Sequence, residues 1–235
     1  MTSFTLKVIA LISMFFDHVG YFIYNGMHSA FNYVGRFAFP IFAYQISEGY
    51  THTHNLKKYF SRLFVFALIS QIPFTLFYFG VIKQLPISEF WPAILTDFRL
   101  NIFFTLFLGL LCIFIFDKLK SKILGLACVA TICFLGNYIN VDYGYWGILL
   151  IFMFYTFKNN KALMAIMYAV MCFIKYANIF VQYNFYYIHV ISCVSTFLAI
   201  IPILLYNGKL GPKTKKLLYI FYPTHLLLIY FATLI

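Results

Sequence analysis

The sequence predicts an all-α polytopic membrane protein, and composition, run length and run pattern all point to it. Hydrophobic residues make up 63% of the 235 residues, 10% are charged, and the mean hydropathy is +0.88. A soluble domain is not expected to have this composition. Apolar runs of about 17–22 residues, long enough to cross about 30 Å of hydrocarbon as a helix, recur from end to end. A membrane β-barrel would alternate apolar and polar residues, whereas these runs are continuous.

Nine apolar runs are each expected to form one transmembrane helix. They are Phe4–Tyr24, Phe31–Gly49, Leu63–Gly80, Asn101–Asp117, Ile123–Ile139, Gly144–Phe157, Ala162–Val181, Phe185–Tyr206 and Leu217–Ile235. In the second run, Pro40 has no N–H for the carbonyl of Arg36, which predicts a kink. The segment Leu85–Leu100 contains two prolines and is expected to hold a short re-entrant or surface helix, which would make ten. No repeat or linker divides the chain, so residues 1–235 are expected to form a single domain.

Basic residues are concentrated in every second loop of this arrangement. The even-numbered loops and their edges hold twelve: Lys57, Lys58, Arg62, Lys118, Lys120, Lys122, Lys158, Lys161, Lys209, Lys213, Lys215 and Lys216. The odd-numbered loops hold two, Lys83 and Arg99. This asymmetry predicts a cytoplasmic N-terminus and an external C-terminus. The net charge of +11 then requires no nucleic-acid partner, because membrane lipid and insertion account for it.

Asp17 and His18 are the most informative polar residues, because they lie deep in the first run. An aspartate at the centre of a membrane helix costs about 2.5–3.5 kcal/mol on insertion, and such residues usually face the protein interior at a functional site. Asp17 is expected to pair with Arg36 of the second run, either as a structural ion pair or as part of a reactive set. All three residues are expected in the outer half of the membrane.

Five further polar residues lie in the runs, and the sequence leaves open whether they join the site. Lys175 and His189 are near enough to the outer interface for their side chains to extend toward water. His225 follows Pro223 and is expected between the cytoplasmic face and the midplane, where it can bond a carbonyl that the proline exposes. The other two are Glu48, near the cytoplasmic end, and Asp142, in the outer half.

The cysteines carry no sign of metal or redox chemistry. All five, Cys112, Cys128, Cys133, Cys172 and Cys193, fall within the predicted spans without a metal-like spacing. Their odd number argues against a complete disulfide framework, so we interpret them as small apolar side chains. No metal site is predicted.

Several segments resemble the TraX family, and the resemblance runs through nearly the whole chain. Its most specific part is the first 75 residues. The matching segments are Asp17–Gly20, Gly35–Phe42, Glu48–Gly49, Lys58–Phe74, Asn101–Gly109, Asp142–Gly144 and Tyr222–Leu226.

The resemblance implies an acetyltransferase of the bacterial inner membrane. Founding members of the family are associated with conjugative transfer, in which they acetylate the N-terminus of pilin. The family is also distantly similar to integral-membrane acyltransferases that move acetyl from cytosolic acetyl-CoA to an acceptor, with a histidine of an early helix as the suspected base. His18 is the matching position. The implied partners are acetyl-CoA and an acceptor peptide, pilin-like protein or small molecule.

The chemistry of the residues agrees with this reading. Acetyl transfer to an amine or hydroxyl needs a base and a group that stabilises the oxyanion. Neutral His18 can be the base. Asp17 can hold Arg36 in place, and Arg36 can stabilise the oxyanion or bind a phosphate. The donor's phosphates would stay at cytoplasmic basic residues, for which Lys57, Lys58 and Arg62 are suitable.

A small-solute or proton-coupled transporter is the alternative function. Asp17, His18, Arg36 and Glu48 would then form a relay or a substrate site at broken helices. Many transporters are built from internal repeats. The sequence has none that we detect, which favours the enzyme.

Overall fold

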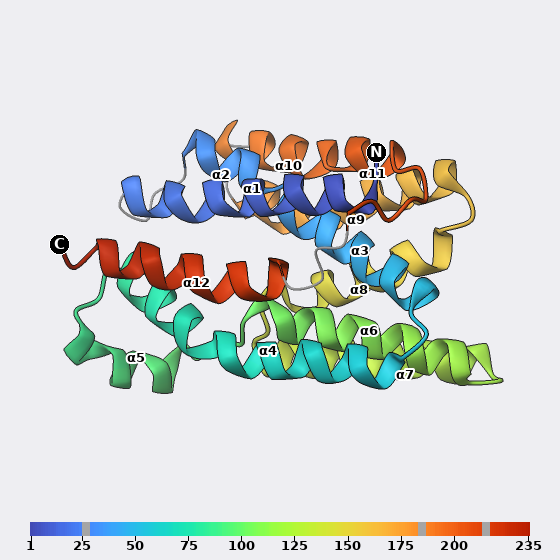
Figure 1. Cartoon of the computed structure of the whole chain (residues 1–235), viewed down its shortest axis with the longest axis horizontal. Helices are drawn as coiled ribbons and strands as arrows, with labels where there is room; N and C mark the ends of the chain where they lie inside the picture. The colour runs from blue at the N-terminus through green and yellow to red at the C-terminus, as the bar shows by residue number, and fades with distance from the viewer. Residues whose placement is uncertain (25–28, 183–186, 213–216) are drawn as a thin grey trace.

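The structure is a computed structural model that describes residues 1–24, 29–182, 187–212 and 217–235, apart from the side chains of residues 178 and 218. Every regular element in these ranges is a helix (Figure 1). The helices are α1 (Ser3–Ile23), α2 (Ala30–Gly35), α3 (Ala38–His52), α4 (Leu56–Phe77), α5 (Phe90–Thr96), α6 (Ile102–Lys118), α7 (Lys122–Tyr138), α8 (Gly144–Phe157), α9 (Lys161–Gln182), α10 (Tyr187–Leu198), α11 (Ile200–Leu204) and α12 (Leu217–Ala232). A π-helical turn, Tyr78–Ile82, extends α4, and a 3₁₀ turn, Ile87–Glu89, precedes α5.

Each predicted run contains helix, but the second run is broken as Pro40 predicts. Helix α2 ends at Gly35 and α3 begins at Ala38, so Arg36 lies at the break. The segment Leu85–Leu100 contains only the 3₁₀ turn and α5, which is a short helix, as expected. The predicted start of the eighth span, at Phe185, lies outside the described residues.

The expected count of nine membrane spans is not confirmed. Four helical segments in the described ranges are long and apolar enough to cross a membrane: Ser3–Ile23, Leu56–Ile82, Lys161–Gln182 and Tyr187–Leu204. Helices α7 and α8 are apolar but have only 17 and 14 residues. At about 1.5 Å per residue they are about 26 and 21 Å long, shorter than the hydrocarbon thickness of about 30 Å. The fold is consistent with a helical membrane protein.

Three of the described connections lie at one end of the molecule. Those after α3, α6 and α8 lie at the end that carries the N-terminus, and the C-terminus lies at the other end (Figure 1). Hydrogen bonds tie the N-terminal amine to the carbonyl of Leu205, at 2.6 Å, and Lys161 Nζ to that of Leu204, at 3.1 Å. The loops with most of the basic residues are therefore gathered at one end.

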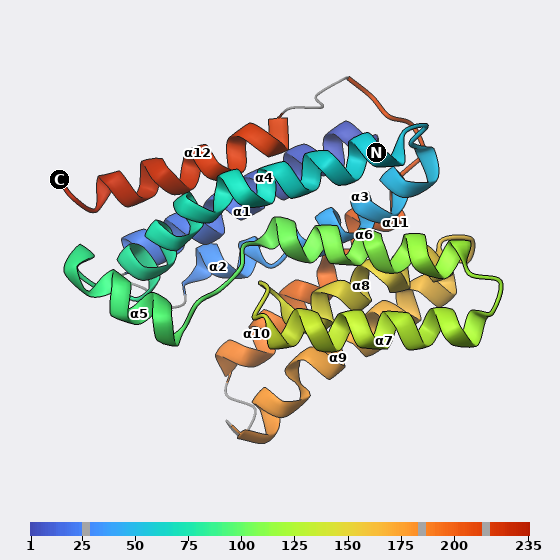
Figure 2. The same cartoon turned by 90° about the horizontal axis from the view of Figure 1, so that it is seen from below.

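The most buried helices are α3 and α8, while other helices present apolar side chains outward. Eight residues of α8 between Trp146 and Phe154 are buried, which covers all sides of the helix. On α7, by contrast, Ile123 is 83% exposed and Phe134 is 71% exposed. Figure 2 shows α7 and α9 at the edge of the molecule. Extensive apolar surface of this kind fits contact with lipid.

Candidate functional site

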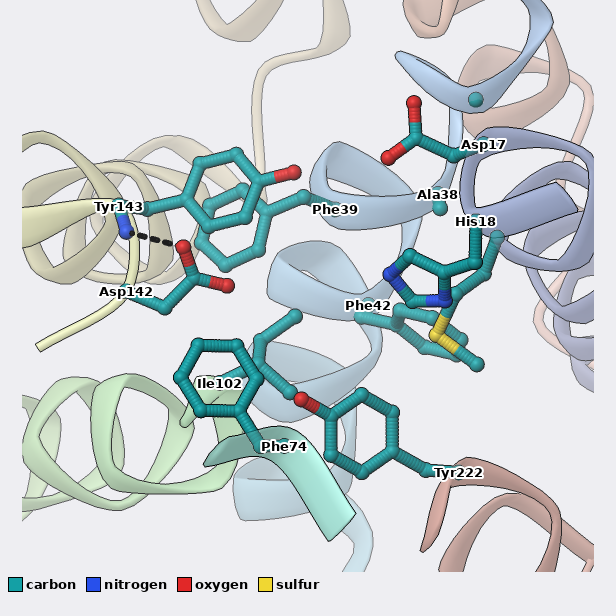
Figure 3. A pocket seen from close by; sticks show the side chains of 12 residues that line it. Asp17, His18, Ala38, Phe39, Phe42, Phe74, Ile102, Asp142, Tyr143 and Tyr222 are labelled. Carbon is teal, nitrogen blue, oxygen red and sulfur yellow. Dashed lines mark hydrogen bonds between the residues drawn. The ribbon is translucent and has the colours of Figure 1, made fainter. Parts of the chain in front are cut away.

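A cavity of about 40 Å³ lies where α1, α3, α4 and α12 approach the segment before α8 (Figure 3). A site of this volume holds a few water molecules, since one water needs about 10–15 Å³ on this measure. The lining residues are Met14, Asp17, His18, Gly35, Ala38, Phe39, Phe42, Phe74, Ile102, Asp142, Tyr143 and Tyr222. Two predicted site residues, Asp17 and His18, are among them.

His18 is bonded to a second histidine, which comes from the other end of the chain. Its Nδ1 lies 2.7 Å from Nε2 of His225 on α12. The two ring centroids are 4.9 Å apart. The bonded nitrogens are thus much closer than the centroids, so the rings meet edge to edge. The ring of Phe77 on α4 packs against His18 in a T-shaped arrangement, at a centroid distance of 4.8 Å.

Asp17 forms the ion pair with Arg36 that the sequence predicts. Nη2 of Arg36 lies 3.6 Å from Oδ1 of Asp17, and the two side chains are 16% and 17% exposed. Asn32 donates to the same carboxylate oxygen at 3.2 Å and to the Asp17 carbonyl at 2.9 Å. Gly35 permits the approach of the helices, because a Cβ there would lie 2.3 Å from that of Asp17. Arg36 Nε is buried without a hydrogen-bond partner among the described residues.

Asp142 and Tyr143 form the wall opposite His18 (Figure 3). Asp142 is held by its backbone, whose N–H donates to the Leu100 carbonyl at 2.8 Å and whose carbonyl accepts from Thr105. Tyr143 has a φ of +63° and stacks on Phe39 at a centroid distance of 3.8 Å. One carboxylate oxygen of Asp142 accepts the backbone N–H of Tyr143 at 3.1 Å. The other points toward the cavity in Figure 3.

Lys175 points inward, so the expectation that it extends to the outer interface is wrong. Its Nζ lies over the rings of Trp146, Tyr143 and Tyr176, at 4.3, 4.9 and 5.5 Å from their centroids. Attraction to aromatic faces compensates part of the loss of hydration of a buried ammonium. Lys175 does not line the cavity itself, but its ammonium contacts the ring of Tyr143, which does.

The structure does not bring the predicted donor-binding residues to the cavity. Lys57, Lys58 and Arg62 are exposed on the first turns of α4. Phe74, which lines the cavity, lies about 18 Å further along that helix at about 1.5 Å per residue. The three residues therefore lie apart from the cavity.

Two other polar residues lie away from the cavity lining. Glu48 faces His52, four residues later on α3, with 3.7 Å between the carboxylate and Nδ1. His189 lies half-buried on α10. Neither is among the lining residues.

His225 is the partner that sequence reasoning missed. The sequence places His18 in the outer half of the membrane and His225 nearer the cytoplasmic face, whereas the bond between them puts both side chains at the same level of the helix bundle. Figure 1 shows the reason: α12 is displaced along the molecule toward the C-terminal end relative to α1. The available signals were its polar character inside an apolar run and the matching segment Tyr222–Leu226. Asp142 and Tyr143 likewise lie in a segment that matches the family, Asp142–Gly144.

The fold and the site define a helical membrane protein with a buried polar centre of histidines, an ion pair and a carboxylate. The TraX protein family matches residues 3–233 of this chain. The chain therefore belongs to the TraX family. It is 27% identical over 245 residues to the "Probable fimbrial assembly protein FimC, serogroup H1" of Dichelobacter nodosus, which covers 97% of this chain and 94% of that protein. No solved structure matches the chain significantly.

Proposed function

We propose that this protein is a membrane acetyltransferase that moves acetyl from acetyl-CoA to an amine or hydroxyl acceptor during pilus or fimbria assembly. The observation that carries the proposal is the position of His18, whose ring projects into a small cavity with a carboxylate on the opposite wall (Figure 3). Membership of the TraX family and the name of the relative, a fimbrial assembly protein, support the biological setting.

In the proposed reaction His18 is the general base. Its free ring nitrogen removes the proton from the acceptor amine or hydroxyl while the acceptor atom bonds to the thioester carbonyl carbon. The carbon–sulfur bond then breaks, and the leaving thiolate takes the proton back from His18, so that acetylated acceptor and CoA are formed. A positioned base of this kind contributes about 10²–10⁴-fold to the rate.

Arg36 supplies positive charge beside the cavity. It pairs with Asp17, which lines the cavity, and its Nε has no hydrogen-bond partner in the described part of the chain. A fixed positive group near the reacting carbonyl stabilises the oxyanion as it develops. Asp17 is a positioning residue, because from α1 it holds Arg36 at the break between α2 and α3.

The donor would enter from the end of the molecule that carries the basic loops. His18 lies about 23 Å along α1 from Ser3, at about 1.5 Å per residue. An extended pantetheine arm can cover much of this distance while its phosphates stay near Lys57, Lys58 and Arg62. A cavity of about 40 Å³ has no room for a thioester and an acceptor, so the helices around it must separate when substrates bind.

The proposal includes a topology. We place the basic end in the cytoplasm of a bacterium and the C-terminus outside, with the protein in the inner membrane. The nine apolar runs would each cross the bilayer, the shorter ones where the membrane thins around the polar centre. The distribution of lysine and arginine supports this orientation.

Calorimetry and CoA release on the detergent-solubilised protein test the proposal. We expect heat on titration with acetyl-CoA, and release of free CoA thiol once amine or hydroxyl acceptors are added. His18→Ala should bind acetyl-CoA but release no thiol. His54→Ala, which changes an exposed histidine outside the helices, should match the wild type. Absence of both heat and thiol release with every acceptor would contradict the enzyme and favour the transporter.

A further inference from the structure

We propose that His225 is a positioning residue that fixes the tautomer of His18 and thereby makes Nε2 the basic nitrogen. The inference rests on the proposed function for its catalytic meaning, while the tautomer itself is independent of any reaction. It follows from two hydrogen bonds that link a backbone carbonyl, His225 and His18 in series.

The first bond fixes the proton of His225. Its Nδ1 lies 2.7 Å from the carbonyl oxygen of Phe221, four residues earlier on the same face of α12. A carbonyl oxygen can only accept a hydrogen bond, so Nδ1 of His225 must carry the hydrogen. In a neutral imidazole the other nitrogen, Nε2, is then an acceptor.

The second bond determines which ring nitrogen of His18 carries the hydrogen. Nε2 of His225 lies 2.7 Å from Nδ1 of His18, and two unprotonated nitrogens would not attract each other at this distance. Nδ1 of neutral His18 must therefore be the donor. This leaves a lone pair on Nε2 of His18, for which no hydrogen-bond partner is found within the described ranges. Figure 3 shows a ring nitrogen of His18 directed into the cavity.

The pair also stabilises the product of the proton transfer. When Nε2 of His18 takes a proton, the ring becomes an imidazolium and both of its nitrogens donate. The bond to His225 then becomes charge-assisted and stronger without any movement of the rings. His225 can accept this bond because its own hydrogen remains on Nδ1, bonded to Phe221. His225 thus acts through His18 rather than on the substrate.

¹⁵N NMR of histidine-labelled protein in detergent micelles tests the tautomer directly. His18→Ala removes one set of signals and so assigns His18. We expect the wild-type ring to carry its hydrogen on Nδ1, with Nε2 showing the shift of an unprotonated nitrogen. His225→Leu should lose this preference, and His225→Gln, whose side-chain oxygen can accept from His18, should retain it. A wild-type His18 with its hydrogen on Nε2 would overturn the proposal without any variant being made.

Kinetics separate positioning from mere structural support. His225→Leu should lower kcat by about 10²-fold, within the range for general-base catalysis. The KM for acetyl-CoA should stay unchanged, and His225→Gln should recover most of kcat. Equal losses in both variants would also contradict the proposal. If the NMR result holds but no acetyl transfer occurs with any variant or the wild type, only the proposed function fails.

Discussion

The ion pair between Asp17 and Arg36 gives the most quantitative prediction. Replacing Asp17 with Ala leaves the guanidinium of Arg36 in a largely buried position without a carboxylate. One of its nitrogens, Nε, already lacks a hydrogen-bond partner among the described residues. The variant should therefore be destabilised far more than a typical surface substitution.

The expected magnitude follows from the geometry. Removing one partner of a buried ion pair costs about 3–5 kcal/mol. The contact of 3.6 Å between Nη2 and Oδ1 is longer than a direct charge-assisted bond, which places Asp17→Ala at about 3 kcal/mol. For a chain of about this length each kcal/mol lowers Tm by about 2–4 °C, so a decrease of about 6–12 °C is expected.

A double-mutant cycle in detergent tests the reasoning. Thermal unfolding is followed by intrinsic fluorescence for Asp17→Ala, Arg36→Met and the double variant. Removing both charges leaves no uncompensated ion, so the double variant should be more stable than Asp17→Ala alone. If the two single losses simply add in the double variant, the two side chains are not coupled and the account of this pair is wrong.

Three further predictions concern other parts of the molecule. Gly35→Ala should lower Tm clearly in the same unfolding assay, because a Cβ at this position lies 2.3 Å from the Asp17 side chain, and an unchanged Tm would refute the close approach. Burial would raise the pKa of Asp97, but the hydrogen bond from Tyr78 and neighbouring cations outweigh it and hold the pKa below the ordinary 3.8. The ionised carboxylate therefore stabilises the folded protein fully above pH 3.8, and this stabilisation is lost as the pH falls through the lower pKa of the folded state. Asp97→Asn should accordingly weaken the dependence of Tm on pH below about pH 4. A reporter fused after Lys120 should read cytoplasmic in cells, and an external reading would reverse the orientation.

The sequence predicted what depends on local chemistry. Pro40 removes a donor from the helix, and the helix is indeed broken at Arg36. A carboxylate and a guanidinium in neighbouring apolar runs must find each other, and Asp17 and Arg36 do so. These inferences needed only the position of a residue within its run and the cost of an unpaired charge in an apolar surrounding.

The rest of the site depends on how the helices are displaced relative to each other. His225 meets His18 because α12 is shifted along α1, and counting residues from the start of each run cannot reveal such a shift. Lys175 turns inward because the rings of Trp146 and Tyr143 come together from the start of α8. Periodicity identifies a polar face but not which faces meet across the chain.

Acetyl transfer in sealed proteoliposomes tests the central claim most directly. Radiolabelled acetyl-CoA is supplied at the basic end of the protein, with a panel of amine and hydroxyl acceptors, and release of CoA thiol and acetylated acceptor are measured together. We expect equal amounts of both with the wild type and with His54→Ala, and a loss of at least about 10²-fold with His18→Ala. Full turnover by a folded His18→Ala protein, or no turnover by the wild type with any acceptor, would contradict the claim that His18 catalyses acetyl transfer.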